Sequence, residues 1–371
     1  MLKRFSVENF KCFQGSFCLD LSKPGNYAFN SECIKDGVVN KAAIYGINGI
    51  GKSNFGLAIF DLINHLTDKS KELEKYENFI NLDGTKSHAY FNYEFKFDDD
   101  VVLYRYEKID VNHLALESLS INGKEFLFYD YQSDKGFSIF PGSEVLNLNS
   151  SDKTLSRVKY VAGTAILVEG DYNNIVLKKF KNFVDNMLLF YSLRRNGYIG
   201  YKQGGDLIEK MIIEADKVND FEMFLNNHGL NLRLDVVETP EGKRLYIKYK
   251  NGQVYYFKEC STGMSSLILL YSWLMQLEKC SFVYIDEFDA FYHYELAETI
   301  VKKLKEFKDT QIIVTTHNTD LMNNDLMRPD CYFILTKDRI DSLNHLTAKD
   351  IRFAHNLQKM FKAEAFNEKD A

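Results

Sequence analysis

The sequence is poor in the residues that mark fibrous, disordered and disulfide-stabilised chains. Its 371 residues include 4 prolines and 21 glycines, too few for a collagen-like or a Pro/Gly-rich disordered protein. The six cysteines are scattered without a Cys-x-x-Cys pair, which favours reduced thiols over a disulfide framework or a zinc knuckle. The composition therefore indicates a globular chain in a reducing compartment, and we expect a cytoplasmic location.

Long apolar segments and an excess of positive charge are also missing. No run of 18 apolar residues occurs, so no membrane-spanning helix is predicted. The opening residues, MLKRFSVENF, contain no apolar signal region, and secretion is not expected. A net charge of −6 excludes a protein coated in basic surface. A local basic groove for nucleic acid stays open.

The chain is long enough, with 45% hydrophobic residues, to bury a large core in two or three lobes. Short alternating segments, Tyr90–Phe97 the clearest, predict strands through the first 140 residues. Between about 152 and 230 the apolar spacing becomes helical, and Ile175–Leu189 and Leu207–Leu225 are predicted helices. Residues 232–257 are expected to form a β-hairpin.

Residues 46–53, GINGIGKS, fit the phosphate-binding pattern G-x-x-x-x-G-K-[ST] at every fixed position. A short apolar strand precedes them, and a helix is expected from Ser53 to Leu66. Glycines let backbone N–H groups curl around phosphate oxygens, and the helix N-terminus adds positive potential. Lys52 is expected to neutralise the β and γ phosphates and Ser53 to bind Mg²⁺. A plain glycine turn is the alternative, but the complete match between strand and helix favours a phosphate site.

An acidic pair follows a predicted buried strand, Phe282–Ile285. The strand would deliver Asp286 to the carboxyl edge of a sheet, where P-loop enzymes hold Mg²⁺. Glu287, next along the chain, is placed to polarise an attacking water as general base. Alone, such a pair is often a solvated turn, and the phosphate loop upstream is what favours a catalytic role.

A second predicted buried strand, Gln311–Thr315, runs into a histidine two residues later. His317 is expected at the tip of this strand, where it can hydrogen-bond the γ-phosphate and the water. A single histidine at a strand end is usually structural. Its place after the phosphate loop and the acidic pair favours a sensor of the γ-phosphate.

A serine- and glycine-containing segment, residues 259–267 (ECSTGMSSL), precedes another predicted helix, Ser265–Glu278. Such residues at a helix N-terminus can form an anion site. Ser261 or Ser265 can equally serve as an ordinary helix cap. From the residues alone, both interpretations stay open.

In this order, the motifs resemble those of the ABC-type ATPase superfamily. Within it, the chain is similar to prokaryotic AAA-type ATP-binding proteins of phage-defence systems, related to the ATPase part of OLD (overcoming lysogenization defect) nucleases and to SMC and DNA-repair ATPases. FSVENFKCF, residues 5–13, resembles their N-terminal strand and turn, and DEFDAFYH, residues 286–293, resembles the segment that begins with their paired acids. The resemblance covers residues 1–60 and about 245–335.

The resemblance implies a nucleotide site shared between two subunits. Its nucleotide-binding residues would be Gly46, Asn48, Gly49, Ile50, Gly51, Lys52, Ser53 and Asn54. The catalytic residues would be Lys52, Glu287 and His317, the metal ligands Ser53 and Asp286, and the signature contacting the opposite subunit's nucleotide Ser261 and Gly263. The signature reads Cys-Ser-Thr-Gly-Met in place of Leu-Ser-Gly-Gly-Gln, and no Q-loop glutamine can be placed.

The fold implied is an α/β two-lobe ABC-type P-loop ATPase head with a mostly helical insertion. The expected parts are an N-terminal lobe (1–150), a helical insertion (151–231), a C-terminal lobe (232–340) and a helical tail (341–371). Apolar residues of the tail recur at helical spacing, which suits docking on a neighbour or packing on the chain's own lobe. Both options stay open. These tail residues are Ile351, Ala354, Leu357, Met360 and Phe361.

The function implied is that of an ATPase using ATP and Mg²⁺. No N-K-x-D guanine-recognition motif occurs, which favours ATP over GTP. The subunits are expected to pair around ATP as a homodimer or a higher even oligomer. The cycle would control a separate effector from a neighbouring gene, a nuclease or toxin in bacterial anti-phage defence. A DNA-repair or chromosome-associated ATPase that clamps DNA is the alternative.

Overall fold

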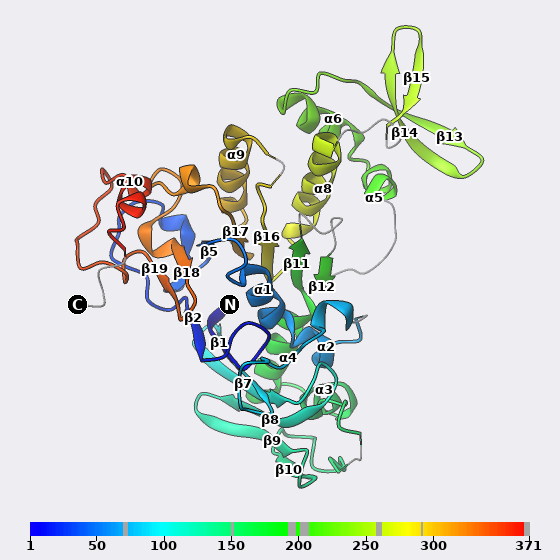
Figure 1. Ribbon diagram of the computed structural model, residues 1–371. Coiled ribbons are helices and arrows are strands. Elements are labelled where there is room, and N and C mark those ends of the chain that lie inside the picture. The colour runs from blue at the N-terminus through cyan, green and yellow to red at the C-terminus, as the bar shows by residue number, and fades with distance from the viewer. Residues whose placement is uncertain are drawn as a thin grey trace.

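The computed structural model describes residues 1–69, 73–149, 152–191, 198–200, 208–256, 262–290 and 292–366. Two seven-stranded sheets form the body of the molecule, and a small third sheet stands at the end farthest from the first (Figure 1). A two-stranded ribbon, β3 (Ile34–Lys35) and β4 (Val38–Val39), completes the described strands. Within the described ranges, no helix has the length and apolar character needed to cross a bilayer.

The first large sheet is antiparallel throughout and has the order β10-β9-β8-β7-β6-β1-β2. Buried and partly exposed residues alternate along β6, so one face joins the core while the other meets water. The predicted strand Tyr90–Phe97 lies within β6. The bounds are β1 Leu2–Glu8, β2 Phe17–Asp20, β6 Ala89–Phe97, β7 Asp100–Lys108, β8 Leu114–Ile121, β9 Lys124–Asp130 and β10 Lys135–Ser138.

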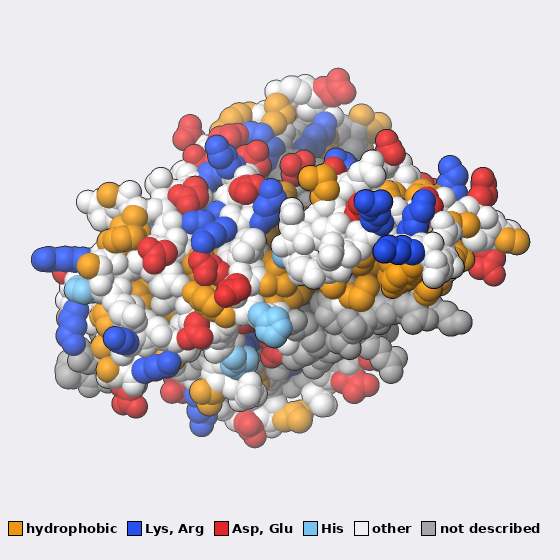
Figure 2. Space-filling model, turned by 90° about the horizontal axis from the view of Figure 1, so that it is seen from above, with side chains coloured by type: hydrophobic (Ala, Val, Ile, Leu, Met, Phe, Trp, Pro, Cys, Tyr) orange, Lys and Arg blue, Asp and Glu red, His pale blue; other side chains and the backbone are white. Residues whose placement is uncertain are grey.

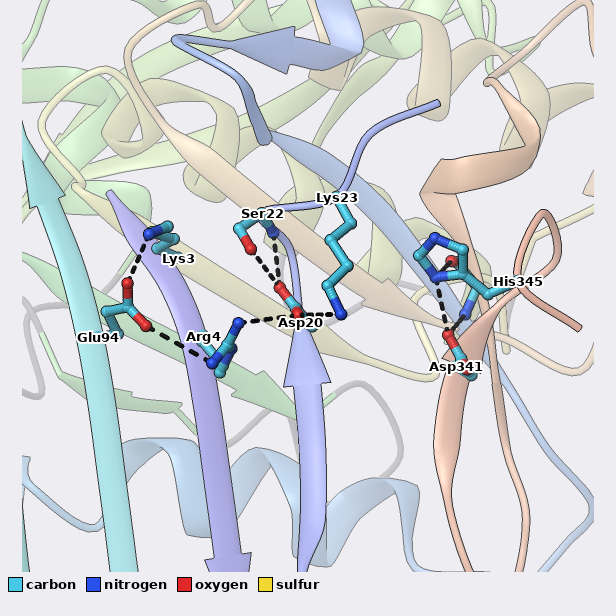
Figure 3. A network of polar contacts seen from close by, with 9 residues as sticks. Lys3, Arg4, Asp20, Ser22, Lys23, Glu94, Asp341 and His345 are labelled. Atoms are coloured by element: carbon cyan, nitrogen blue, oxygen red, sulfur yellow. Dashed lines mark hydrogen bonds and ion pairs between the residues drawn. The ribbon is translucent and has the colours of Figure 1, made fainter. Parts of the chain in front are cut away.

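The water-facing side of this sheet carries a row of ion pairs across β6, β1 and β2 (Figure 3). Arg4 lies between Asp20, at 3.2 Å, and Glu94, at 3.9 Å. Lys3 contacts the same Glu94 at 2.5 Å, and Lys23 contacts Asp20 at 3.2 Å. Exposed pairs of this kind contribute little to stability. Their charges make this face of the sheet polar and suited to water. The apolar face on the other side of the sheet packs on the core.

The second large sheet has the order β12-β11-β16-β17-β5-β18-β19, with five parallel inner strands and antiparallel edge strands. Every residue of β5, β11, β16 and β17 is buried, as expected of parallel strands covered on both faces. The bounds are β5 Lys41–Tyr45, β11 Met187–Tyr191, β12 Tyr198–Gly200, β16 Phe282–Asp286, β17 Gln311–Thr315, β18 Tyr332–Leu335 and β19 Ile340–Ser342.

Helix α1 (Lys52–Phe60) lies between the two sheets and joins them. Its Phe55 ring packs edge-on against Phe5 of β1, with 5.6 Å between centroids. On the side of the parallel sheet, the Tyr284 hydroxyl of β16 donates to the Lys52 carbonyl at 2.8 Å. After its polar first turn the helix is apolar on all sides from Phe55 to Phe60, which suits such a buried position. The two sheets and α1 form the two-lobe α/β P-loop ATPase head that the family resemblance implies.

Most of the other described helices lie around these sheets, and α5 and α6 stand away from them (Figure 1). The α-helices are α2 Ile63–Leu66, α3 Arg157–Thr164, α4 Tyr172–Asp185, α5 Ile208–Glu214, α6 Val218–Asn227, α8 Thr262–Leu277, α9 Tyr294–Lys305 and α10 Leu357–Lys362. The 3₁₀ helices are η1 Ser31–Cys33, η2 Leu73–Tyr76, η3 Thr319–Leu321 and η4 Pro329–Cys331. The predicted helix Ser53–Leu66 is therefore divided between α1 and α2.

The structure differs from the helical insertion expected across residues 151–231. The predicted helix Ile175–Leu189 stops at Asp185, and β11 begins two residues later in the centre of the parallel sheet. Helix α4 packs on the antiparallel sheet, where the Phe180 and Phe95 rings lie 5.3 Å apart. Residues 152–191 thus belong to the ATPase body. The run MLLFY is fully apolar, and periodicity cannot separate a buried strand from a buried helix.

The part that stands away from the body contains α5, α6 and the third sheet (Figure 1). The predicted helix Leu207–Leu225 is divided, and Asp216 between α5 and α6 has a φ of 53°. The expected hairpin has a third strand because a turn separates β14 from β15. The three strands are β13 Leu234–Thr239, β14 Gly242–Tyr249 and β15 Gly252–Tyr255.

Up to Phe366, where the described residues end, the C-terminal segment contains one short helix, α10, in place of an extended helical tail. Ile351 and Leu357 are buried in the chain's own core, and Met360 and Phe361 pack against it. Ala354, which the helical spacing placed on the same stripe, is exposed. Of the two options for this stripe, the structure shows packing on its own lobe.

Candidate active site

The phosphate loop follows β5 directly and ends where α1 begins. Gly49 and Gly51 have φ values of 78° and 112°, which side chains rarely adopt, so the loop's turns depend on these two glycines. Gly51 stands immediately before α1, where backbone N–H groups are free to meet an anion. The loop has the form that the sequence pattern predicts for binding phosphate.

Lys52 points back along the loop from the first position of α1. Its side chain is buried, and its Nζ donates to the carbonyls of Gly46, at 3.1 Å, and Ile47, at 3.4 Å. The same Nζ lies 2.7 Å from Nε2 of His317. Burial, and then the charge of Lys52, lower the pKa of His317 below its usual 6.5. His317 is therefore neutral at pH 7, and its Nε2 can accept a hydrogen bond.

Ser53 and Asp286 meet directly beneath the loop, although 233 positions separate them in the chain. The Ser53 hydroxyl donates to Asp286 Oδ2 at 2.6 Å, and the carboxylate is buried at the end of β16. A hydroxyl and a carboxylate are hard oxygen ligands of the type that Mg²⁺ takes, with phosphate oxygens and water completing its shell. The two residues fit a site for Mg²⁺, which would supply positive charge to the phosphates.

Glu287 adopts a left-handed conformation, with a φ of 49°, where β16 turns away from the sheet. Its carboxylate lies 3.8 Å from Nε2 of His317, which places it on the same side of the loop as Lys52. A non-glycine residue held in this conformation is frequently part of a functional site. The structure thus brings Lys52, Ser53, Asp286, Glu287 and His317 together at the carboxyl edge of the parallel sheet.

The other residues expected in the site lie on the phosphate loop, in the first turns of α1 and α8, or outside the described residues. Asn48 is exposed and Ile50 partly so, and Nδ2 of Asn54 contacts Sγ of Cys12 at 3.3 Å. Ser261 lies outside the described residues, and Gly263 lies in the first turn of α8.

Two threonines at the end of β17 are part of this site and were missed by the sequence reasoning. Thr315 bonds to Asp286 and to the backbone of Glu287, while the Thr316 hydroxyl donates to Asp289 Oδ2 at 2.8 Å. Burial raises the pKa of Asp289. The sequence feature that could have indicated them is their place in the chain, because they are the two residues before His317, at the end of a predicted buried strand.

A cavity of about 580 Å³ adjoins the phosphate loop, and Gly46 and His317 are among the residues that line it. Its walls include Ile47 and Ile50 from the loop, Lys337 from the β18–β19 turn, and Phe361 and Lys362 of α10. The sequence gives no hint of this contact, because nothing in the tail's spacing specifies which part of the chain it meets. The C-terminal segment is thus adjacent to the nucleotide-binding loop.

The fold and site together define a P-loop ATPase head of the ABC type. Residues 41–323 match the family described as "AAA domain, putative AbiEii toxin, Type IV TA system", and the chain belongs to this family. No curated protein matches the chain.

Solved structures of SMC head domains are similar along most of the chain. The SMC head domain from Thermotoga maritima is 17% identical over 92% of this chain and 98% of that one, with a TM-score of 0.46. The Smc head domain with a coiled coil and joint from Pyrococcus yayanosii is 11% identical over 98% of each chain, with a TM-score of 0.49.

Proposed function

We propose that this protein hydrolyses ATP in the cytoplasm and acts as a nucleotide-driven switch. The observation that carries the proposal is the meeting of Ser53 with Asp286, at 2.6 Å, beneath a complete phosphate loop. Glu287 and His317 stand beside this pair, 3.8 Å apart, where the γ-phosphate and an attacking water would lie. Lys52, at the loop, supplies the charge that compensates the phosphates.

In the proposed reaction, Glu287 accepts a proton from the water that attacks the γ-phosphate. Lys52 leaves its carbonyl partners and His317 to contact the β and γ oxygens, and the single ring N–H of neutral His317 donates to the γ-phosphate. The loop's N–H groups hold the phosphate oxygens in place, so most of the catalytic effect comes from position and charge. ADP and phosphate make fewer of these contacts than ATP, and the site therefore reports which nucleotide it holds.

The experiment that tests this function is turnover of MgATP by the purified protein, with Lys52→Ala as the decisive variant. We expect the wild-type chain to release phosphate and the variant to bind ATP about ten- to a hundredfold more weakly, since a charged hydrogen-bond donor is lost. Lys135→Ala, at an exposed position of β10 in the antiparallel sheet, serves as the matched control. Equal ATP affinity in wild type and Lys52→Ala would contradict the assignment.

We further propose that two chains close around two ATP molecules, with Ser261 and Gly263 of each contacting the nucleotide of the other. The support is the family resemblance and the exposed loop residues Ile47 and Asn48 beside the phosphate site. Such closure would make ATP part of the interface, and hydrolysis would reopen it. The resulting two-state assembly is what allows the chain to control another protein.

The protein that is controlled is proposed to be a separate effector, a nuclease or toxin of a bacterial anti-phage system. The family description, with its AbiEii toxin and type IV toxin–antitoxin system, supports a partner of this kind. On the face seen from above, lysines and arginines are interspersed with aspartates and glutamates, which does not favour a DNA-clamping surface (Figure 2).

Two measurements separate the effector role from DNA clamping. Co-expression with the protein of the neighbouring open reading frame is expected to yield a stable complex, and plasmid DNA is expected to change ATP turnover less than twofold. Stimulation by DNA of tenfold or more, without a complex, would instead favour a chromosome-associated ATPase. The Lys52→Ala variant, tested in the same assays, shows whether complex formation depends on nucleotide.

A further inference from the structure

The hydroxyl of Thr315 lies between the two acids of the candidate active site. It donates to Asp286 Oδ1 at 2.8 Å and accepts the backbone N–H of Glu287 at 2.7 Å. The residue is completely buried at the last position of β17, beside β16 in the sheet. One oxygen atom therefore touches both the proposed metal ligand and the backbone of the proposed base.

Asp286 is held from two sides by this arrangement. Ser53 occupies Oδ2 and Thr315 occupies Oδ1, so the plane of the carboxylate is fixed relative to the phosphate loop. Without the Thr315 hydroxyl, Oδ1 would be a buried carboxylate oxygen that has lost its donor, which is costly and favours rotation toward other partners. The orientation of a metal-binding carboxylate depends on such supporting hydrogen bonds.

Glu287 is held through its backbone. The left-handed conformation at this residue, with a φ of 49°, persists only where the surroundings fix it. Thr315 supplies two of the fixing contacts, because its hydroxyl accepts the Glu287 N–H and its carbonyl accepts the N–H of Phe288 at 3.1 Å. The turn after β16 is thus fastened to the end of β17 at two successive residues.

We propose that Thr315 is a positioning residue for ATP hydrolysis, orienting Asp286 toward Ser53 and setting the backbone from which Glu287 reaches the γ-phosphate. This inference rests on the proposed ATPase function. Thr315 does not touch nucleotide in this role, and it acts through the two acids. A β-branched threonine suits the task because its χ1 is restricted in a strand, which holds the hydroxyl in one direction.

The test compares Thr315→Val, which keeps the shape without the hydroxyl, with Thr315→Ser, which keeps the hydroxyl. We expect valine to lower kcat about ten- to a hundredfold, the effect of losing a buried hydrogen bond to a charged group. ATP affinity is expected to change less than threefold, since the phosphate loop is intact. Serine is expected to restore kcat to within about threefold of wild type.

Thr310→Val is the matched control, at the residue immediately before the other end of β17. Its hydroxyl is buried and donates to the carbonyls of Leu277, at 2.6 Å, and Cys280, at 3.0 Å, far along the strand from the acids. We expect this variant to unfold at a lower denaturant concentration while its kcat stays within twofold of wild type. The control therefore shows how far the loss of a buried threonine hydroxyl lowers stability when the two acids are not affected.

The outcomes separate the inference from the function on which it rests. Wild-type turnover together with an unchanged kcat in Thr315→Val would overturn the inference and leave the ATPase assignment standing. Equal losses of kcat in Thr315→Val and Thr310→Val would also overturn it, since the effect would then be structural. A wild-type protein that binds ATP but never hydrolyses it would refute the ATPase function and, with it, any positioning for hydrolysis.

Discussion

Replacement of Glu287 by glutamine is expected to lower ATP turnover about a hundred- to ten-thousandfold while ATP still binds. Glutamine keeps the size of the side chain and the left-handed turn, but its amide cannot accept the proton of an attacking water. Lys52, Ser53 and the phosphate loop, which hold the nucleotide, are untouched. The measurements are kcat at saturating MgATP and equilibrium binding of a fluorescent ATP analogue.

The same variant is also expected to accumulate in the ATP-bound assembly, because the step that reopens it is blocked. Sedimentation with ATP should then show a larger species than with ADP. Glu238→Gln, which makes the same chemical change at an exposed position on β13, should leave turnover unchanged. If Glu287→Gln turned over ATP normally, another group would be the base, and if it failed to bind ATP, the residue would be structural.

The site could be anticipated from the sequence because its parts are local motifs at the ends of strands. GINGIGKS specifies its own turn, and the strands before Asp286 and His317 are short apolar runs. Parallel strands place their carboxyl ends at one edge, which explains why five residues from three segments meet there. The roles of these residues in hydrolysis stay predictions until turnover is measured.

Features that depend on distant partners could not be read in the same way. The predicted helix Ile175–Leu189 overlaps β11, because MLLFY gains its strand character only by pairing with β16, far along the chain. Thr315 is an ordinary strand residue in the sequence, and its importance comes from two acids on the neighbouring strand. In both cases the missing information was a contact between segments, which composition and spacing do not contain.

Lys108 shows what a sequence pattern can indicate about a buried residue and what it cannot. Along β7, buried residues alternate from Asp100 to Lys108, so the period-2 pattern puts this lysine on the inward face with Tyr104 and Tyr106. The pattern could have signalled a buried charge. It could not have named the partner, Asp61, which follows α1 and is separated from Lys108 by the whole of β6.

The ion pair between Lys108 and Asp61 fastens the end of α1 to the antiparallel sheet. Nζ of Lys108 lies 2.7 Å from Asp61 Oδ2, and both side chains have 0% exposure. The Tyr106 hydroxyl donates to the same oxygen at 2.9 Å, and Nδ2 of Asn64 donates to Oδ1 at 3.2 Å. The opposite end of this helix begins with Lys52, so the pair supports the element that carries the phosphate loop.

We expect Lys108→Met to lower the free energy of unfolding by about 3–5 kcal/mol, because it leaves the Asp61 carboxylate buried without its counter-charge. Urea unfolding followed by tryptophan fluorescence measures the loss. Lys135→Met, at an exposed position of β10, should change stability by only about 0.5 kcal/mol. The double variant Asp61→Asn with Lys108→Met removes both charges and should recover much of the loss. A loss below about 1 kcal/mol in Lys108→Met would mean that the buried carboxylate is accommodated by Tyr106 and Asn64 alone, and that the ion pair does not secure α1.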